Sequence, residues 1–348
     1  MKNYFRLTLM LAVIALMGCE NPIAQETRVH EDGSLDKSII FEKTDSSVLE
    51  RNIFHVGPEN GWKVSVSPVI DGKNNDKLRV QFDKSFPSAE AMNAELDAPS
   101  DTLFRVKSSF EKKFRWFYTY IRYSETYRPL NRFMMLPYDD FFNAEDMQFI
   151  RRLPAEGARI SKADSVSLQM LNVKVDDYYA RAAIANEQVD ILRQLLVLTN
   201  TRTSLLDSLE SVREVFFEQL ENDKGDENFV MRMTDSLKIK FADRARAATV
   251  ADSLSESLNA RLQFMSYVRD GRYQAMIEIP WTVVETNADS VVGNRLYWRP
   301  LQHKFLFTDY ELYAESRQLN VLTATLSAVL IGFTLLLWIW RARRNKSA

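Results

Sequence analysis

Hydrophobic and polar residues alternate in the early part of the chain, and this two-residue period predicts β-strands. Residues 27–43, TRVHEDGSLDKSIIFEK, contain an Asp32-Gly33 pair that favours a hairpin turn, with the apolar strand residues 39–41 after it. GWKVSVSPVI and KLRVQF, at 61–70 and 77–82, alternate on either side of the turn sequence DGKNND. We therefore predict two hairpins, the second with one face exposed to water.

An aromatic segment follows at 114–127, FRWFYTYIRYSETY. It is dense in aromatic and β-branched residues, and both of its faces are apolar when it is extended. This pattern predicts one central strand that is covered on both sides. A platform for stacking bases or sugars would use the same residue types. That alternative stays open, although such a ladder more often packs into a core.

Alternation returns near the end of the chain, in the segment 273–300. Tyr273, Ala275 and Ile277 occupy one face, and turns are predicted at NADS and at Gly293-Asn294. RLYW and TDYELYAES then predict two further strands. Together the early and late strands predict an antiparallel sheet.

Between these regions the apolar period changes from two residues to between three and four, which is typical of helices. Apolar stripes occur at 147–153, 184–196, 205–220, 233–241 and 250–265, with Thr203 or Ser204 as the expected N-cap of the third. The stripes must pack against something, so we predict a helical insertion in the sheet domain. Coiled-coil pairing between chains is the alternative, but no heptad pattern continues for three or four repeats.

The segment 321–340, VLTATLSAVLIGFTLLLWIW, has twenty residues without a charge. At about 1.5 Å per residue it spans about 30 Å, the thickness of a hydrocarbon core. The aromatic residues at its end are typical of the membrane–water interface, and the cationic residues after them predict a cytoplasmic tail by the positive-inside rule. The predicted membrane anchor is marked by Val321, Trp338, Trp340, Arg341, Arg343 and Arg344.

The N-terminal segment predicts export. Lys2 and Arg6 precede a short apolar run, 7–17, which fits a signal peptide better than a membrane span. The residues LMGC at 16–19 then resemble the lipobox of bacterial lipoproteins. The resemblance implies cleavage between Gly18 and Cys19 and a lipid on the Cys19 sulfur, with palmitate among its acyl chains.

The two ends of the chain agree on one topology. A signal peptide and a stop-transfer helix with a basic tail place the bulk of the chain in the periplasm or outside the cell, and the C-terminus in the cytoplasm of a bacterium. We expect attachment to the inner (plasma) membrane. The expected fold class is α+β with one C-terminal transmembrane helix. The expected parts are a signal peptide at 1–18, a β-rich domain at 19–135 and 272–318, a helical insertion at 136–271, the membrane helix at 319–340 and a basic tail at 341–348.

Composition and charge exclude several functions. The net charge of −2 gives no overall basic field for nucleic acid. One cysteine excludes an internal disulfide and a CxxC zinc site. The histidines His30, His55 and His303 lie far apart in the sequence, and no nucleophile or phosphate-binding motif occurs. The adjacent carboxylates Asp139-Asp140 fit a helix cap, supported by Asn143, better than acid–base chemistry. We expect no cofactor, no metal and no enzyme.

One family resemblance rests on turn and packing residues near the C-terminus. The segment IPWTVVETNADSVVGNRLYW, followed by a last strand and a membrane helix, resembles the C-terminal half of LppM-like envelope lipoproteins. The EDGS turn at 31–34 matches the start of that family loosely. The matching positions are Pro280, Val283, Thr286, Asn287, Gly293, Asn294 and Trp298, whereas Trp281 replaces the usual glycine. The resemblance implies an extracytoplasmic sheet with helices that binds a lipid or glycolipid, and it implies no enzyme.

Three functional hypotheses follow. The first is a non-enzymatic binding module for an envelope lipid, a glycolipid or a protein partner, with a ligand groove between the sheet and the helices. Its expected groove lining is Phe114, Trp116, Tyr118, Tyr120 and Ile277. The second is a scaffold subunit of a membrane complex, which predicts an apolar patch on the insertion. Thr323, Ser327 and Gly332 are too irregular to define a helix-pairing face. The third is an envelope hydrolase, with a site assembled from distant residues.

Overall fold

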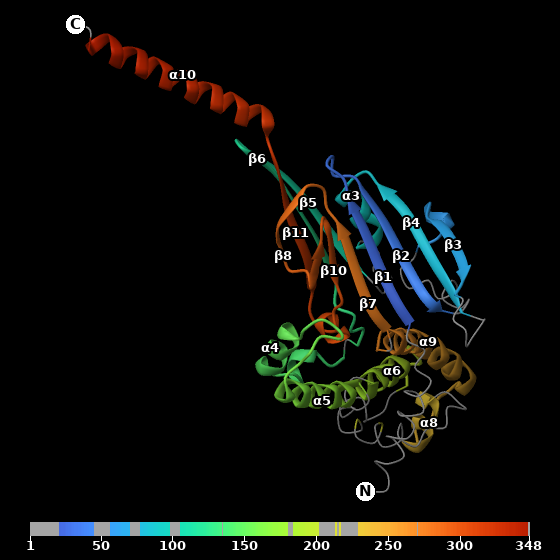
Figure 1. Cartoon of the computed structure of the whole chain (residues 1–348). Helices are drawn as coiled ribbons and strands as arrows, with labels where there is room; N and C mark the ends of the chain where they lie inside the picture. The colour runs from blue at the N-terminus through green and yellow to red at the C-terminus, as the bar shows by residue number, and fades with distance from the viewer. Residues whose placement is uncertain are drawn as a thin grey trace. The chain divides into compact units, whose positions relative to one another are not determined.

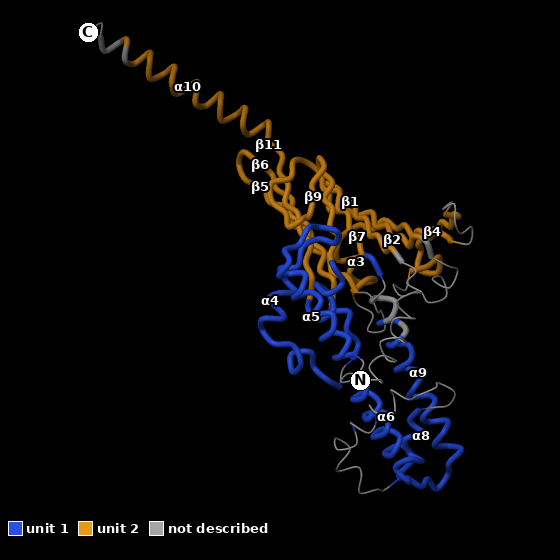
Figure 2. The backbone as a smooth tube through the Cα atoms, turned by 60° about the horizontal axis from the view of Figure 1, so that its bottom comes forward, with its two compact units in different colours: residues 1–21, 129–272, 301–308 blue, residues 22–128, 273–300, 309–348 orange. Residues whose placement is uncertain are grey.

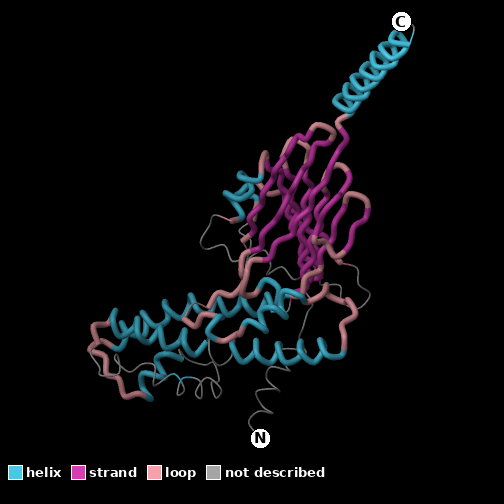
Figure 3. Tube along the Cα trace, turned by 90° about the vertical axis from the view of Figure 1, so that its left-hand side faces the viewer, coloured by secondary structure: helices cyan, strands magenta, loops and turns pink. Residues whose placement is uncertain are grey.

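The computed structural model describes residues 21–44, 56–69, 77–97, 105–133, 135–179, 184–201, 213, 216, 229–269 and 271–346. Within these ranges the chain divides into two compact units (Figure 2). Of the described residues, one unit holds those within 22–128, 273–300 and 309–346, and the other holds those within 129–272 and 301–308. Strands make up most of the first and helices most of the second (Figure 3). The expected α+β class is confirmed.

The first unit contains two β-sheets (Figure 1). The larger sheet has the strand order β3-β4-β2-β1-β7-β10-β9, and the smaller has the order β5-β6-β11-β8. The strands of the larger sheet are β1 (Asn21–Val29), β2 (Leu35–Thr44), β3 (Lys63–Pro68), β4 (Leu78–Phe86), β7 (Gly271–Glu278), β9 (Ser290–Val292) and β10 (Arg295–Trp298). Those of the smaller sheet are β5 (Val106–Arg115), β6 (Tyr118–Tyr127), β8 (Thr282–Thr286) and β11 (Tyr310–Leu319).

The two predicted early hairpins are confirmed. β1 and β2 pair antiparallel around the Asp32-Gly33 turn, where Gly33 has φ +92° and a Cβ atom would lie 3.0 Å from the ring of Phe110. A side chain at this glycine would be strained by its backbone and crowded by the ring. β3 and β4 also pair antiparallel. β3 is an edge strand and is mostly exposed, so Val66 remains in contact with solvent.

The prediction of a single central strand at 114–127 is wrong. The chain reverses at Trp116-Phe117, and Arg115 pairs with Tyr118, so the segment is the end of β5, a two-residue turn and β6. The turn contains no glycine, proline or asparagine, the residues that usually signal one. Aromatic residues continue through it without a break in the alternation. The pattern therefore concealed the reversal.

The two sheets contact each other through their buried faces. The core includes Ile23 and Ile39 of the larger sheet and Ile121 and Leu312 of the smaller one. In most strands residues at every second position point inward, as the period-two pattern predicts, but β3, β8 and β9 have no buried residues. The helix α3 (Ala89–Leu96) begins at Ser88, whose hydroxyl accepts the amide hydrogen of Ala91. Its Asn93 makes two hydrogen bonds to the backbone of Ser108, of 2.7 and 2.6 Å, and so protects the edge strand β5.

The second unit is helical. Its α-helices are α4 (Ala144–Arg152), α5 (Lys162–Asp177), α6 (Ile184–Leu198), α8 (Phe229–Ser236) and α9 (Arg244–Arg269), with the 3-10 helices η2 (Tyr138–Asp140) and η5 (Gln302–Phe305). Packing among α6, α8 and α9 buries Leu192, Met233 and Leu258. No apolar stripe was predicted for the residues of α5. The stripe predicted at 205–220, with its cap, lies almost entirely outside the described residues.

Helix ends in this unit follow local chemistry. The cap expected at Asp139-Asp140 is instead Asn143, which caps α4 in a reciprocal capping box with Asp146, while Asp139 and Asp140 lie in η2. The helix predicted over 233–241 is shorter than expected, because α8 ends at Ser236. Lys238 takes a left-handed conformation with φ +55°, and the amide of Ile239 then bonds back to the carbonyl oxygen of Thr234.

Candidate functional site

The most distinctive element for function is α10 (Val321–Lys346), which follows β11 after the single residue Asn320. Val321–Arg341 has a mean hydropathy of 2.1 and is long and apolar enough to cross a membrane. Its most apolar part has no buried residues. A helix in the core of a soluble protein would instead bury one face. The membrane helix expected from the sequence is therefore present as one candidate span.

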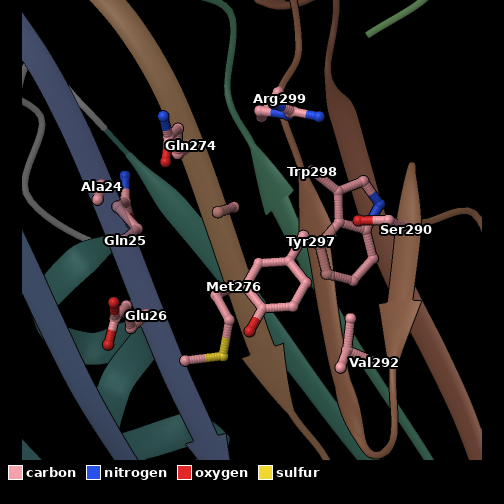
Figure 4. A pocket seen from close by; sticks show the side chains of 11 residues that line it. Ala24, Gln25, Glu26, Gln274, Met276, Ser290, Val292, Tyr297, Trp298 and Arg299 are labelled. Carbon is pink, nitrogen blue, oxygen red and sulfur yellow. The ribbon is translucent and has the colours of Figure 1, made fainter.

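A groove lies on the outer face of the larger sheet, opposite the core (Figure 4). It has a volume of about 390 Å³ and crosses β1, β7, β10 and β9. Its floor is partly apolar, and Tyr297 stands directly across from Met276 in the strand register. Polar groups from three strands surround it. The lining side chains that face outward are Ala24, Glu26, Gln274, Met276, Ser290, Val292, Tyr297 and Arg299.

The combination of an apolar floor with charged edges suits an amphipathic ligand. Met276 is flexible and polarisable, so it adapts to irregular apolar shapes. Tyr297 adds an aromatic face with a polar end. Glu26 and Arg299 provide one carboxylate and one guanidinium for hydroxyl or phosphate groups. The volume is at the lower end of the range for small-molecule sites.

The residues that sequence analysis expected in one groove do not come together. Phe114 and Trp116 lie exposed at the tip of the β5–β6 hairpin, with Tyr118 and Tyr120 half-buried beside them. Ile277 is in the other sheet, where it is buried. The residues of the outer-face groove were missed. Their signal was weak, because Met276 is a single apolar residue on the face opposite Tyr273, Ala275 and Ile277, and Ala24 lies before the first predicted hairpin.

A network of buried polar groups lies between the two sheets. Lys37 of β2 donates hydrogen bonds to Glu125 of β6, at 3.0 and 2.9 Å, and to Thr27 of β1, at 3.0 Å. The Glu125 carboxylate also accepts hydrogen bonds from Thr27, Tyr123 and Tyr127, those from the two tyrosines measuring 2.9 and 3.1 Å. Lys37 and Glu125 have side-chain exposures of only 0% and 1%.

The ionisation of this network follows from its contacts. Burial alone would raise the pKa of Glu125, but the Lys37 ammonium and the hydrogen bonds from Thr27, Lys37 and Tyr123 outweigh it, so the pKa is lowered. Burial and the Glu125 charge raise the pKa values of Tyr123 and Tyr127 well above the ordinary range. Because the network is closed to solvent and its carboxylate is fully paired, it is suited to joining the sheets rather than to turning over a substrate.

The described histidines do not form a catalytic or metal cluster. His30 contacts Asp36 at 2.8 Å on the surface. His303 is buried, and burial lowers its pKa to about 4, so it is neutral at physiological pH. His55 lies outside the described residues. Among the residues that the structure describes, no group of three or more histidine, cysteine, aspartate or glutamate side chains is arranged to hold a metal.

Several predictions concern residues that the structure does not describe. The signal peptide, its expected cleavage position at Gly18 and the lipidation site Cys19 all lie before residue 21.

The anchor residues Val321, Trp338 and Trp340 lie on α10 and are exposed, as are Arg341 and Arg343 farther along the same helix. Arg344 also belongs to α10. The compartment on each side of α10 stays a prediction.

Comparisons with known proteins add little to this geometry. No protein-family model matches the chain, and no curated protein matches it. Among solved structures it is similar to the NMR structure of the folded domain of LppM from Mycobacterium tuberculosis. The two share 9% sequence identity and a TM-score of 0.27, over 87% of this chain and 92% of that one. This similarity, to a lipoprotein, is too weak to carry an argument about fold or function.

Proposed function

We propose that the protein is a membrane-anchored, non-enzymatic binding module that presents its β-domain outside the cytoplasm of a bacterium. The observation that carries this proposal is α10, an apolar helix with none of its most apolar part buried, which continues from the last strand of the domain. A helix of this kind is stable only where hydrocarbon or another apolar surface covers it. The basic residues after it support a cytoplasmic C-terminus.

Two further features support the same topology. The predicted signal peptide would export the domain, and a lipid on Cys19 would supply a second attachment. A lipid chain alone gives reversible binding, whereas a spanning helix holds a protein essentially permanently. Because the helix needs cytoplasm on one side, the proposed location is the inner membrane, with the domain in the periplasm or at the cell exterior.

The proposed ligand is an amphipathic envelope molecule, a lipid or a glycolipid, in the outer-face groove. The apolar floor at Met276 and Tyr297 would take acyl or ring carbons, and Glu26, Gln274 and Arg299 would bind hydroxyl or phosphate groups. Tethering keeps the domain at a high local concentration near such molecules. The function would be to bind and present the ligand at the membrane surface.

Cysteine labelling in intact cells tests the topology. Ser65→Cys places a thiol on the exposed strand β3, and Ala348→Cys places one in the tail. A membrane-impermeant maleimide should label the first in spheroplasts and the second only after lysis, with the wild-type chain as the background for Cys19. Labelling of the tail in intact spheroplasts, or no labelling of Ser65→Cys before lysis, would refute the topology.

Lipid analysis tests the ligand. The full chain is extracted into detergent, and lipids retained after extensive washing are identified by mass spectrometry. Ala24→Trp fills the groove, whereas Ser65→Trp adds the same side chain to exposed β3, away from the groove. The first variant should lose the retained species and the second should keep it. Equal retention by both variants would contradict a ligand in this groove.

A second candidate function, a scaffold for a protein partner, is favoured by α5. Val166, Met170 and Val173 are exposed apolar residues at spacings of four and three, so they share one face of this helix. The scaffold hypothesis predicted such a patch on the helical region. Replacing all three with serine should abolish co-purification of a stoichiometric partner while leaving lipid retention unchanged. Retained partner binding would exclude this face.

A further inference from the structure

The tip of the β5–β6 hairpin exposes large aromatic side chains that the proposed groove does not use. Phe114, Trp116 and Phe117 are 63%, 52% and 47% exposed. They are consecutive or nearly so, and they form one projection at the end of the smaller sheet. Exposed aromatic clusters of this size usually mark a binding surface rather than a solvated one.

This tip is fastened to the start of α10. The Trp116 indole Nε1 donates a hydrogen bond of 2.7 Å to Ser327 Oγ, and Ser327 donates one of 2.7 Å to the carbonyl oxygen of Thr323. Thr323 Oγ1 in turn donates to the Trp116 carbonyl oxygen. Thr323 and Ser327, which showed no regular pattern in the sequence, thus face the hairpin together.

Backbone contacts of Asn320 complete the attachment. Its backbone amide donates a hydrogen bond of 2.8 Å to the carbonyl oxygen of Phe117, and its side-chain amide donates one of 3.0 Å to the carbonyl oxygen of Arg115. The hairpin tip and the helix therefore meet at both the first turn of α10 and the next. Figure 1 shows β6 reaching toward the start of α10.

The position of Ser327 indicates how far the tip extends along the helix. Ser327 lies six residues beyond Val321, the first residue of the candidate span, which corresponds to about 9 Å along the helix axis. The span itself is about as long as a hydrocarbon core is thick. Trp116 therefore lies beside the outer third of the apolar segment, close to the boundary between headgroups and acyl chains, where interfacial elements insert their apolar side chains.

Cations surround the aromatic tip. Arg115 lies over the Tyr120 ring at 5.2 Å, and Arg317 over the Tyr118 ring at 4.6 Å. Lys112 lies over Trp281 at 5.4 Å. Long cationic side chains beside aromatic rings can hold their charge in the headgroup layer while their stems cover apolar surface. The charge and the apolar tip together fit a lipid surface with anionic headgroups.

We propose that the β5–β6 tip is a second membrane-contacting element, whose aromatic side chains lie at the boundary between headgroups and acyl chains in the leaflet on the domain's side. Its partner is the bilayer that α10 crosses, with anionic headgroups facing Lys112, Arg115 and Arg317. The inference rests on the proposed function, because it requires α10 to span a membrane. The bonds between Trp116 and α10 would then fix the orientation of the β-domain at the membrane surface.

Site-directed spin labelling tests this in the full-length protein reconstituted in phosphatidylcholine vesicles, with and without phosphatidylglycerol. Labels are placed at Phe117→Cys and Phe114→Cys, at Val329→Cys on α10 and at Ser65→Cys on exposed β3. The measured quantity is the ratio of accessibility to oxygen and to a water-soluble nickel complex. The ratio at 117 should be several-fold higher than at 65, and should rise further with phosphatidylglycerol.

The outcomes separate the two proposals. If the label at 329 is in hydrocarbon but those at 117 and 114 are as water-accessible as the one at 65, the tip proposal is overturned and the anchor stands. If the label at 329 is also in water, the anchor proposal fails. A third outcome would also overturn the proposal. If the label at 117 remains inaccessible to the nickel complex in lipid-free amphipol and its spectrum shows spin–spin broadening, the tip contacts a second copy of the chain.

Discussion

The two halves of the β5–β6 hairpin use similar residues in opposite environments. The half far from α10 buries Ile121, Tyr123 and Tyr127 between the sheets, together with the charged Glu125. The half near α10 exposes Phe114, Trp116 and Phe117. Both halves are rich in aromatic residues, and both are β-structure. Residue type and period therefore define which face a side chain occupies, but not what covers that face.

The charges in the two halves differ in the same way. Glu125 is neutralised inside the protein by Lys37, and four side chains donate hydrogen bonds to its carboxylate. Arg115 and Lys112 instead lie over rings at the surface, at 5.2 and 5.4 Å. A buried charge needs a partner within the protein, whereas an exposed charge is solvated by water and remains accessible to a ligand. The inner half thus holds the domain together, and the outer half is available to bind.

The largest expected effect comes from removing Glu125. Glu125→Ala leaves the Lys37 ammonium buried without a counterion, which should lower the free energy of opening of β2 and β6 by about 3–5 kcal/mol. Amide hydrogen exchange of peptides that cover these strands, in the full chain, measures the change. The double variant Lys37→Met/Glu125→Leu is the matched control; it removes both charges but leaves the hydroxyls of Thr27, Tyr123 and Tyr127 without the carboxylate acceptor, so it should lose clearly less stability than the single variant. If the double variant lost as much as the single one, charge pairing would not explain the effect.

His303 is a buried titratable group whose pKa is shifted by burial alone, whereas the pKa of Glu125 is set by burial and by its partners. No described residue pairs with its Nδ1, and its pKa is lowered from 6.5 to about 4. Because the folded-state pKa is the lower one, its contribution is fully present above pH 6.5 and is lost as the pH falls toward 4. The loss should approach about 3 kcal/mol in the helical unit. Hydrogen exchange of the 301–308 segment at several pH values, corrected for intrinsic rates, measures it. His303→Gln should remove this dependence, and an unchanged pH profile in that variant would assign it to other groups.

Trp281 tests a strained position at the turn between β7 and β8. Its φ of +72° favours glycine, and its indole donates a hydrogen bond of 2.7 Å to Glu31. Trp281→Ala keeps the strain and loses the contact, whereas Trp281→Gly loses the contact but relieves the strain. The glycine variant should therefore be about 1 kcal/mol more stable than the alanine variant. Urea unfolding of the full chain in detergent, followed by exchange at β7, compares the two. Equal stability would mean that the turn relaxes in both.

The parts of the fold that the sequence predicted are those with local signals. The Asp32-Gly33 hairpin and the apolar span of α10 each depend on residues that are close together in the sequence. The turn at Trp116-Phe117 was missed because aromatic residues on both sides hide it. The groove around Met276 was missed because it depends on which strands become neighbours, and β1 lies beside β7, nearly 250 residues later in the sequence. Single-sequence periodicity contains no information about such pairings.

The smallest expected effect on stability comes from the exposed half of the hairpin. Phe117→Ser removes a side chain that is about half exposed, so the free energy of opening of β6 should change by less than about 1 kcal/mol. Ile121→Ser, on the buried half of the same strand, is the matched control and should cost at least about 2 kcal/mol. Hydrogen exchange of β6 peptides in detergent measures both. In vesicles the measured quantity is the membrane depth of a spin label at position 114. Phe117→Ser should reduce this depth more than Ile121→Ser does. A large loss of stability from Phe117→Ser in detergent would mean that this ring is held by the protein, and the two halves of the hairpin would then differ less than their exposure indicates.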